Sequence, residues 1–253
     1  MDFKSDKISD KIEGRNPVIE ALSSGRIIDK ILVQNGEKHG SILKILAMAK
    51  EKRIAISYVD KAKLDSIATS HSHQGVIAYV AAKEYVSVSD ILNIAKDRGE
   101  QPLIVICDEI TDPHNLGSII RSANAAGAHG IIISKHGGVG LNATVAKTSA
   151  GAVEFTPVAK VSSIAQTIEQ LKKENVWVVG ADMDGENTIH THDFGGALAI
   201  VVGNEGKGIS RLVKERCDFL VRIPMLGEIS SLNASVAAAL MIYEAIRARS
   251  IAK

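Results

Sequence analysis

The sequence predicts an α/β protein in two parts, a small front domain and a larger domain built on a parallel sheet. The larger domain is indicated by apolar strands that alternate with helical segments. Two strands, 103–107 (LIVIC) and 198–202 (LAIVV), are apolar at every position, which is typical of strands covered on both faces. A polar stretch with one short helical pattern, 83–101, precedes these strands. We therefore expect domains over 12–82 and 102–253, with 83–101 as the linker.

The front domain is predicted from an alternation of helices and strands that starts near residue 14. Asn16 and Pro17 suit the N-cap and the first position of a helix. The other expected elements are strands at 28–33, 54–59 and 75–81, and helices at 41–52 and from 61 onward. The residues before this pattern mix acids with lysines and lack an apolar core. We expect a short disordered lead there, and neither a secretion signal nor a transit peptide.

The larger domain is expected to hold six strands and five helices. The strands are 103–108, 130–134, 153–158, 176–181, 197–202 and 219–223, and the helices are 117–126, 143–149, 162–174, 209–215 and 232–249. Parallel strands place their carboxyl ends at one edge of the sheet, and ligands bind outside that edge. The polar stretches 112–121, 202–209 and 223–233 all follow strand ends. We therefore expect them to meet at one site.

Composition narrows the class of protein. Hydrophobic residues make up 45% and charged residues 23%, as in soluble globular proteins, and no apolar run approaches the ~18 residues of a membrane span. The two cysteines, Cys107 and Cys217, lack metal-ligand spacing and favour a reduced cytoplasm. His71 and His73 share a turn without enough further ligands for zinc, so we expect no metal and a polar turn that touches RNA. A net charge of +1 does not indicate a globally basic nucleic-acid binder.

The glycine-rich stretch GNEGKG fits neither of two common nucleotide-binding motifs. Gly208 is followed by Ile209, so the Gly-x4-Gly-Lys-Ser/Thr spacing of a phosphate loop is absent. No Gly-x-Gly-x-x-Gly follows the first strand of this domain either. Taken singly, Glu205 fits a solvated loop acid, Arg121 a surface salt bridge and Asn115 a helix cap.

Together, three motifs in order are more specific. They are DEITDPHNLGSIIRSA (108–123), VGNEGKG (202–208) and IPMLGEISSLNASVA (223–237). This pattern resembles the SpoU/TrmH family of RNA ribose 2′-O-methyltransferases. The resemblance covers about residues 12–249, nearly the whole chain.

The front half carries the resemblance further. GRNPV (14–18) and HQGV (73–76) look like the small ribosomal-protein-like RNA-binding domain of the RlmB-like subgroup, which methylates guanosine in 23S ribosomal RNA. LNAT (141–144) also fits that subgroup. The resemblance implies a C-terminal SPOUT methyltransferase domain with a trefoil knot, behind a smaller N-terminal α/β RNA-binding domain. It also implies S-adenosylmethionine (S-adenosyl-L-methionine) as the cofactor.

The resemblance assigns candidate site residues by position. Asn115, Arg121, Glu205, Ser231 and Asn233 match the family's catalytic residues. The backbone around three further residues matches the cofactor-binding positions, namely Gly203, Ile223 and Leu232.

The chemistry gives these residues roles. A ribose hydroxyl must lose its proton as it attacks the methyl group, and the resemblance implicates Arg121 beside an RNA phosphate. Because arginine is effectively always protonated, we expect it to clamp and orient the phosphate, and its role as base stays open. Asn115, Ser231 and Asn233 would position ribose and phosphate, and Glu205 would hold Arg121 or Asn115. The donor brings its own leaving group, so no metal is needed.

These observations lead us to expect a cytoplasmic 23S ribosomal RNA guanosine 2′-O-methyltransferase. The family implies a homodimer with active sites at the subunit interface. A face of small residues, Ala234, Ala238 and Ala245, would allow close approach of a second copy, or equally packing within one chain. Two alternatives stay open: methylation of another ribosomal or transfer RNA nucleotide, and a non-catalytic RNA-binding ribosome-assembly factor.

Overall fold

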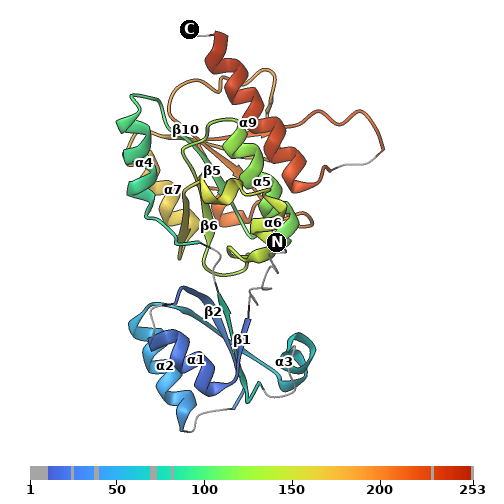
Figure 1. Ribbon diagram of the computed structural model, residues 1–253. Coiled ribbons are helices and arrows are strands. Elements are labelled where there is room, and N and C mark those ends of the chain that lie inside the picture. Colours follow the sequence, from blue (N-terminus) through green and yellow to red (C-terminus); the bar gives the residue numbers. More distant parts are fainter. Residues whose placement is uncertain are drawn as a thin grey trace, which may run out of the picture. The chain divides into compact units, whose positions relative to one another are not determined.

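The computed structural model divides into two compact units (Figure 1). The structure describes residues 11–23, 26–36, 40–68, 73–80, 83–228 and 231–251. The first unit is formed mainly by residues up to Glu84, and the second mainly by those from Tyr85 onward. No helix of the described residues is long and apolar enough to cross a membrane.

The first unit is a mixed sheet of four strands in the order β1-β4-β2-β3. The strands are β1 (Lys11–Glu13), β2 (Ile28–Gln34), β3 (Ala55–Val59) and β4 (Val76–Val80). Only β2 and β3 run parallel. Helices α1 (Arg15–Ser23) and α2 (Ser41–Glu51) pack on one core cluster of this sheet, and α3 (Lys61–Ile67) packs on another through Leu64.

Three details of this unit differ from the sequence-based expectation. Helix α1 begins at Arg15, so Asn16 lies within its first turn and is not the N-cap. Strand β1 falls inside the expected disordered lead, because Ile12 finds a partner in Ala78 of β4, far along the chain. His73 is buried, with Nε2 2.8 Å from Asp65 Oδ1 and Nδ1 accepting from Gly75 N–H, so it holds the turn together. His71 lies outside the described residues.

The second unit is a sheet of seven strands in the order β7-β6-β5-β10-β8-β11-β9, and all its pairings are parallel. The strands are β5 (Leu103–Cys107), β6 (Gly130–Ser134), β7 (Val158–Val161), β8 (Trp177–Ala181), β9 (Asn187–Thr188), β10 (Leu198–Val202) and β11 (Phe219–Arg222). The core strands β5 and β10 are buried at every residue, as their apolar sequences predict.

Helices cover both faces of this sheet (Figure 1). They are α4 (Val88–Asp97), α5 (Pro113–Ala125), α6 (Ala143–Thr148), α7 (Ile164–Lys173), α8 (Arg211–Lys214) and α9 (Ala234–Ile251), with a short 3₁₀ helix, η1 (Ala152–Glu154). Helices α4, α7 and α8 share one core cluster, and α5 and α9 pack together on the sheet elsewhere. The predicted α/β class with a covered parallel sheet is thereby confirmed. The trefoil knot stays a prediction.

Two expectations for this unit are corrected. The stretch 83–101 is not a linker for most of its length. Its helical pattern forms α4, which begins at a Ser87–Asp90 capping box, and fully buried Ile91 packs in the core of the second unit. The strand expected at 153–158 is wrong. Its first residues form η1, and β7 begins only at Val158, where pairing with β6 starts.

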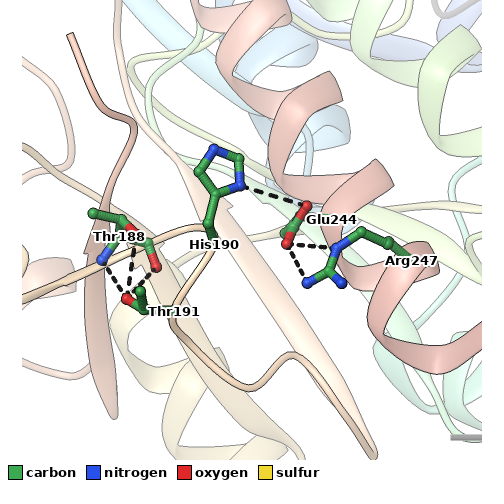
Figure 2. Close-up of polar contacts among 5 residues, drawn as sticks. All are labelled: Thr188, His190, Thr191, Glu244 and Arg247. Carbon is green, nitrogen blue, oxygen red and sulfur yellow. Dashed lines mark hydrogen bonds and ion pairs between the residues drawn. The ribbon is translucent and has the colours of Figure 1, made fainter. Parts of the chain in front are cut away.

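Hydrogen bonds and an ion pair hold the C-terminal half of α9 in place. Arg249 donates from Nη1 to the Gln101 carbonyl at 3.0 Å, and from Nη2 to the carbonyls of Pro102 and Gly196, both at 2.6 Å. Figure 2 shows a second fastening, where buried Glu244 accepts two hydrogen bonds from Arg247 and lies 3.9 Å from His190 Nδ1. The Arg249 contacts join α9 to the segments before β5 and β10. The Glu244 contacts join α9 to His190, before β10, and to its own Arg247.

Loss of the Arg249 contacts should destabilise the second unit. We expect Arg249→Met to lower the free energy of unfolding by about 1.5–3 kcal/mol, because three carbonyl groups lose a charged donor. The measurement is the urea concentration at the midpoint of unfolding. The free energy of unfolding should fall with urea at the same slope in the compared proteins. Arg211→Met is the control, since Arg211 is exposed and pairs only with Glu215 one turn away. Equal midpoints for Arg249→Met and Arg211→Met would contradict a stabilising role for the Arg249 contacts.

Candidate active site

A cavity of about 480 Å³ opens at the carboxyl edge of the second sheet. Its walls come from the segment after β8 (181–184), the loop after β10 (202–208) and the start of α9 (231–237). The volume falls in the range of about 300–1,000 Å³ that is usual for small-molecule sites. Two of the three polar stretches therefore line one cavity, as parallel strands require.

The third polar stretch joins through Asn115, in the first turn of α5. Its Nδ2 donates a short hydrogen bond to Glu205 Oε1, and its Oδ1 accepts from Asn233 Nδ2 at 2.9 Å. Asn115 itself is buried. One amide side chain thus links α5, the loop after β10 and the start of α9, which lie 90 and 118 residues apart from it in the chain.

Each member of this network is held by its own element. Asp112 caps α5 by accepting from His114 N–H at 2.9 Å, with Pro113 at the first helical position. Asn233 Oδ1 accepts from the N–H of Ser235 at 2.9 Å, as a helix cap does. The cap of α9 therefore fixes the Asn233 amide, and the cap of α5 fixes the start of the helix that carries Asn115.

The loop that carries Glu205 is closed on itself. Backbone bonds join Asn204 and Gly208 in both directions, and Asn204 Oδ1 accepts from the N–H groups of Gly206 and Lys207. Asn204 Nδ2 donates to the Glu109 carbonyl at 3.0 Å. A Cβ added at Gly203 would overlap the backbone of Gly208 and the next residue. Gly203 is therefore needed for this backbone contact, in addition to lining the cavity.

The remaining predicted residues are not part of this hydrogen-bond network. Ser231 and Leu232 line the cavity, whereas Ile223 is half-buried just beyond β11 and does not. Arg121 is exposed, and within the described residues its side chain makes no hydrogen bond or ion pair. Six residues along a helix turn it about 120° away from Asn115. Glu205 therefore holds Asn115 and not Arg121.

Three further residues line the cavity that sequence reasoning did not name. Asp182, Met183 and Asp184 follow β8. Lys214 Nζ lies 2.7 Å from Asp182 Oδ2 and 3.5 Å from Asp184 Oδ2, and the hydrogen bond to Asp182 raises the lysine pKa. Their position after a predicted strand end was the available signal.

Both cysteines lie in surroundings that keep their thiols protonated. Burial raises the pKa of both Cys107 and Cys217 to about 12, so neither thiol ionises near neutral pH. The described residues contain no group of three or more His, Cys, Asp or Glu side chains placed to hold a metal ion.

The chain matches known proteins over most of its length. The SpoU rRNA Methylase family model matches residues 102–243, and the model for RNA 2′-O ribose methyltransferase substrate binding matches 11–86. YacO of Bacillus subtilis (strain 168), assigned by name to the TrmH family of tRNA/rRNA methyltransferases, is 48% identical over 240 residues, which cover 95% of this chain and 96% of YacO.

Solved structures share the architecture. The SpoU methyltransferase AviRb from Streptomyces viridochromogenes, in complex with AdoMet, matches with a TM-score of 0.61 at 27% identity, over 96% of this chain and 91% of that one. An AdoMet-bound rRNA methyltransferase from Sinorhizobium meliloti matches with a TM-score of 0.57 at 25% identity, over 94% and 86%. The chain therefore belongs to the SpoU/TrmH family of RNA 2′-O-ribose methyltransferases.

Proposed function

We propose that this protein methylates the ribose 2′-hydroxyl of a guanosine in 23S ribosomal RNA, as a cytoplasmic homodimer. The observation that carries the proposal is the Asn115–Glu205–Asn233 network beside a ligand-sized cavity. Family membership supports RNA ribose methylation itself, on tRNA or rRNA. The resemblance of 14–18 and 73–76 to the RlmB-like subgroup supports the narrower target.

The methyl donor is S-adenosylmethionine, and the cavity fits it. AviRb and the Sinorhizobium meliloti enzyme were both solved with this molecule. The donor is a cation at its sulfonium, and the cavity wall carries three carboxylates, those of Asp182, Asp184 and Glu205. When bound, the donor supplies an activated methyl group together with its leaving group.

The side chains around the cavity would position the ribose. Asn115 and Asn233 present amide groups whose orientation their mutual hydrogen bond restricts. Glu205 accepts from Asn115 Nδ2, which keeps Asn115 Oδ1 directed at Asn233 and so helps to hold the Asn233 side chain in place. Ser231 is exposed at the cavity wall and is free to contact ribose or phosphate. Such alignment of the attacking oxygen can contribute roughly 7–11 kcal/mol to a bimolecular transfer.

Arg121 supports the homodimer. Its exposed guanidinium stands apart from the network of its own chain, so a phosphate clamp at that network needs an arginine from a second copy. The small residues Ala234, Ala238 and Ala245 do not serve the interface, because all three are buried within the chain. The exposed apolar stripe of α9 is a better candidate; it consists of Val236, Leu240 and Tyr243, which line a hollow of about 390 Å³ with Ser118 and Ser122 of α5.

The function is tested by mapping ribose methylation in RNA from a deletion strain. We expect one guanosine of 23S ribosomal RNA to lose its 2′-O-methyl group, and the purified protein to restore it. RNA with a 2′-deoxy target should bind and accept no methyl group. An unchanged methylation map would favour the assembly-factor alternative, and a lost methyl group on transfer RNA would refute the 23S target.

Mixing two inactive variants tests the shared site. Arg121→Ala and Asn115→Ala should each collapse methyl transfer. Random exchange of subunits makes half of the dimers mixed, and each mixed dimer has one intact site if the two residues come from different chains. We therefore expect single-turnover activity to return to about a quarter of wild type. No recovery after confirmed subunit exchange would place both residues in one chain's site.

Gly203→Ala tests the closed loop. Because a Cβ there would overlap backbone, we expect a loss of about 1–3 kcal/mol in the free energy of unfolding, together with weaker binding of S-adenosylmethionine. Gly206→Ala is the matched control, since a Cβ there meets only Asn204 Oδ1 at an ordinary 3.6 Å. Calorimetry and urea unfolding measure both effects. Wild-type behaviour of Gly203→Ala would show that the loop has room to relax.

A further inference from the structure

Lys207 occupies a fixed place at the rim of the cavity. It lies on the closed loop between Gly206 and Gly208, and its backbone N–H donates to Asn204 Oδ1 at 3.2 Å. Asn204 is in turn anchored to the Glu109 carbonyl. The lysine backbone is therefore as well defined as that of Glu205, two residues earlier, although the side chain is exposed.

The charges of the cavity wall leave Lys207 without a partner. Of the four charged residues that line it, Asp182 and Asp184 share Lys214, and Glu205 accepts from Asn115. The Lys207 ammonium makes no hydrogen bond or ion pair with any residue that the structure describes. It is thus the one lining cation of this described wall, and no ion pair with a described residue holds its ammonium group.

RNA carries negatively charged phosphates that could pair with the Lys207 ammonium. A ribose in RNA is flanked by phosphates, and each of them must approach a wall with three carboxylates, which repel it. A cation at the rim offsets that repulsion, and lysine binds phosphate as a point charge. Phosphate contacts fix the register of a nucleic acid on a protein without reading its sequence.

We propose that Lys207 is a positioning residue that holds an RNA phosphate beside the target ribose. The inference rests on the proposed methyltransferase function. It assigns to each chain a phosphate contact on the Glu205 loop, in addition to the one proposed for Arg121. Binding of RNA at this site should then depend on salt through Lys207.

The test compares wild type with Lys207→Ala, Lys207→Arg and Lys173→Ala. Lys173 is an exposed lysine at the end of α7 that does not line the cavity, so its loss is a matched change of charge. Affinity for 23S ribosomal RNA transcribed in vitro is measured between about 50 and 200 mM salt. Binding of S-adenosylmethionine is measured separately by calorimetry.

For Lys207→Ala we expect the slope of log affinity against log salt to fall by about 0.7–0.9, the value of one phosphate contact. Affinity should fall about twofold to fivefold, and KM for RNA should rise more than kcat falls. Lys207→Arg should restore the slope, and Lys173→Ala should match wild type. Donor affinity should not change.

Two results would overturn the proposal. One is a wild-type salt slope in Lys207→Ala. The other is a loss of donor affinity with an unchanged RNA slope, which would assign the ammonium to the donor's carboxylate. Because RNA binding is measured without methyl transfer, wild-type protein that binds RNA yet transfers no methyl group would refute the proposed function separately.

Discussion

The hydrogen bonds of a single buried amide, Asn115, hold the site together. A parallel sheet brings the carboxyl ends of its strands to one edge, but it leaves the loops that follow them free to diverge. Asn115 donates to Glu205 and accepts from Asn233, so two of those segments share one partner on α5. An aspartate would be isosteric, but it would place a carboxylate against Glu205. The amide is needed because it offers a donor and an acceptor on one side chain.

The loop around Gly203 shows that structural and ligand-binding roles need not be separate. The resemblance named Gly203 only as a cofactor-binding position. The space beside its Cα is filled by the backbone of Gly208, so the residue also has a structural role. This close approach is what directs Glu205 toward Asn115 and Lys207 toward the rim of the cavity. The same loop therefore shapes the cavity wall, carries one member of the network and supplies the unpaired cation.

Much of the fold could be predicted from sequence because its central strands are continuously apolar. Strands β5 and β10 match their expected ranges closely, and so do the polar stretches that follow them. Elements that depend on distant partners were missed. Strand β1 is defined only by its pairing with β4, and β9 only by its pairing with β11. Local composition does not carry that information.

The candidate site shows the same limit. Asn115, Glu205 and Asn233 were named from motifs, and their contacts span the chain in a way that no spacing rule could predict. Asp182 and Asp184 were passed over because no motif marks them, although they follow a strand end.

Arg121 illustrates why a single chain does not explain every motif residue. It shares helix α5 with Asn115, yet helical geometry turns the two side chains about 120° apart. An exposed arginine that faces away from the network of its own chain fits the proposed role at a second copy better than a role in its own chain. On this view the motif that contains both residues serves two sites at once. Under the proposed homodimer, Asn115 would complete the network of its own chain and Arg121 that of the partner, so catalysis would depend on assembly.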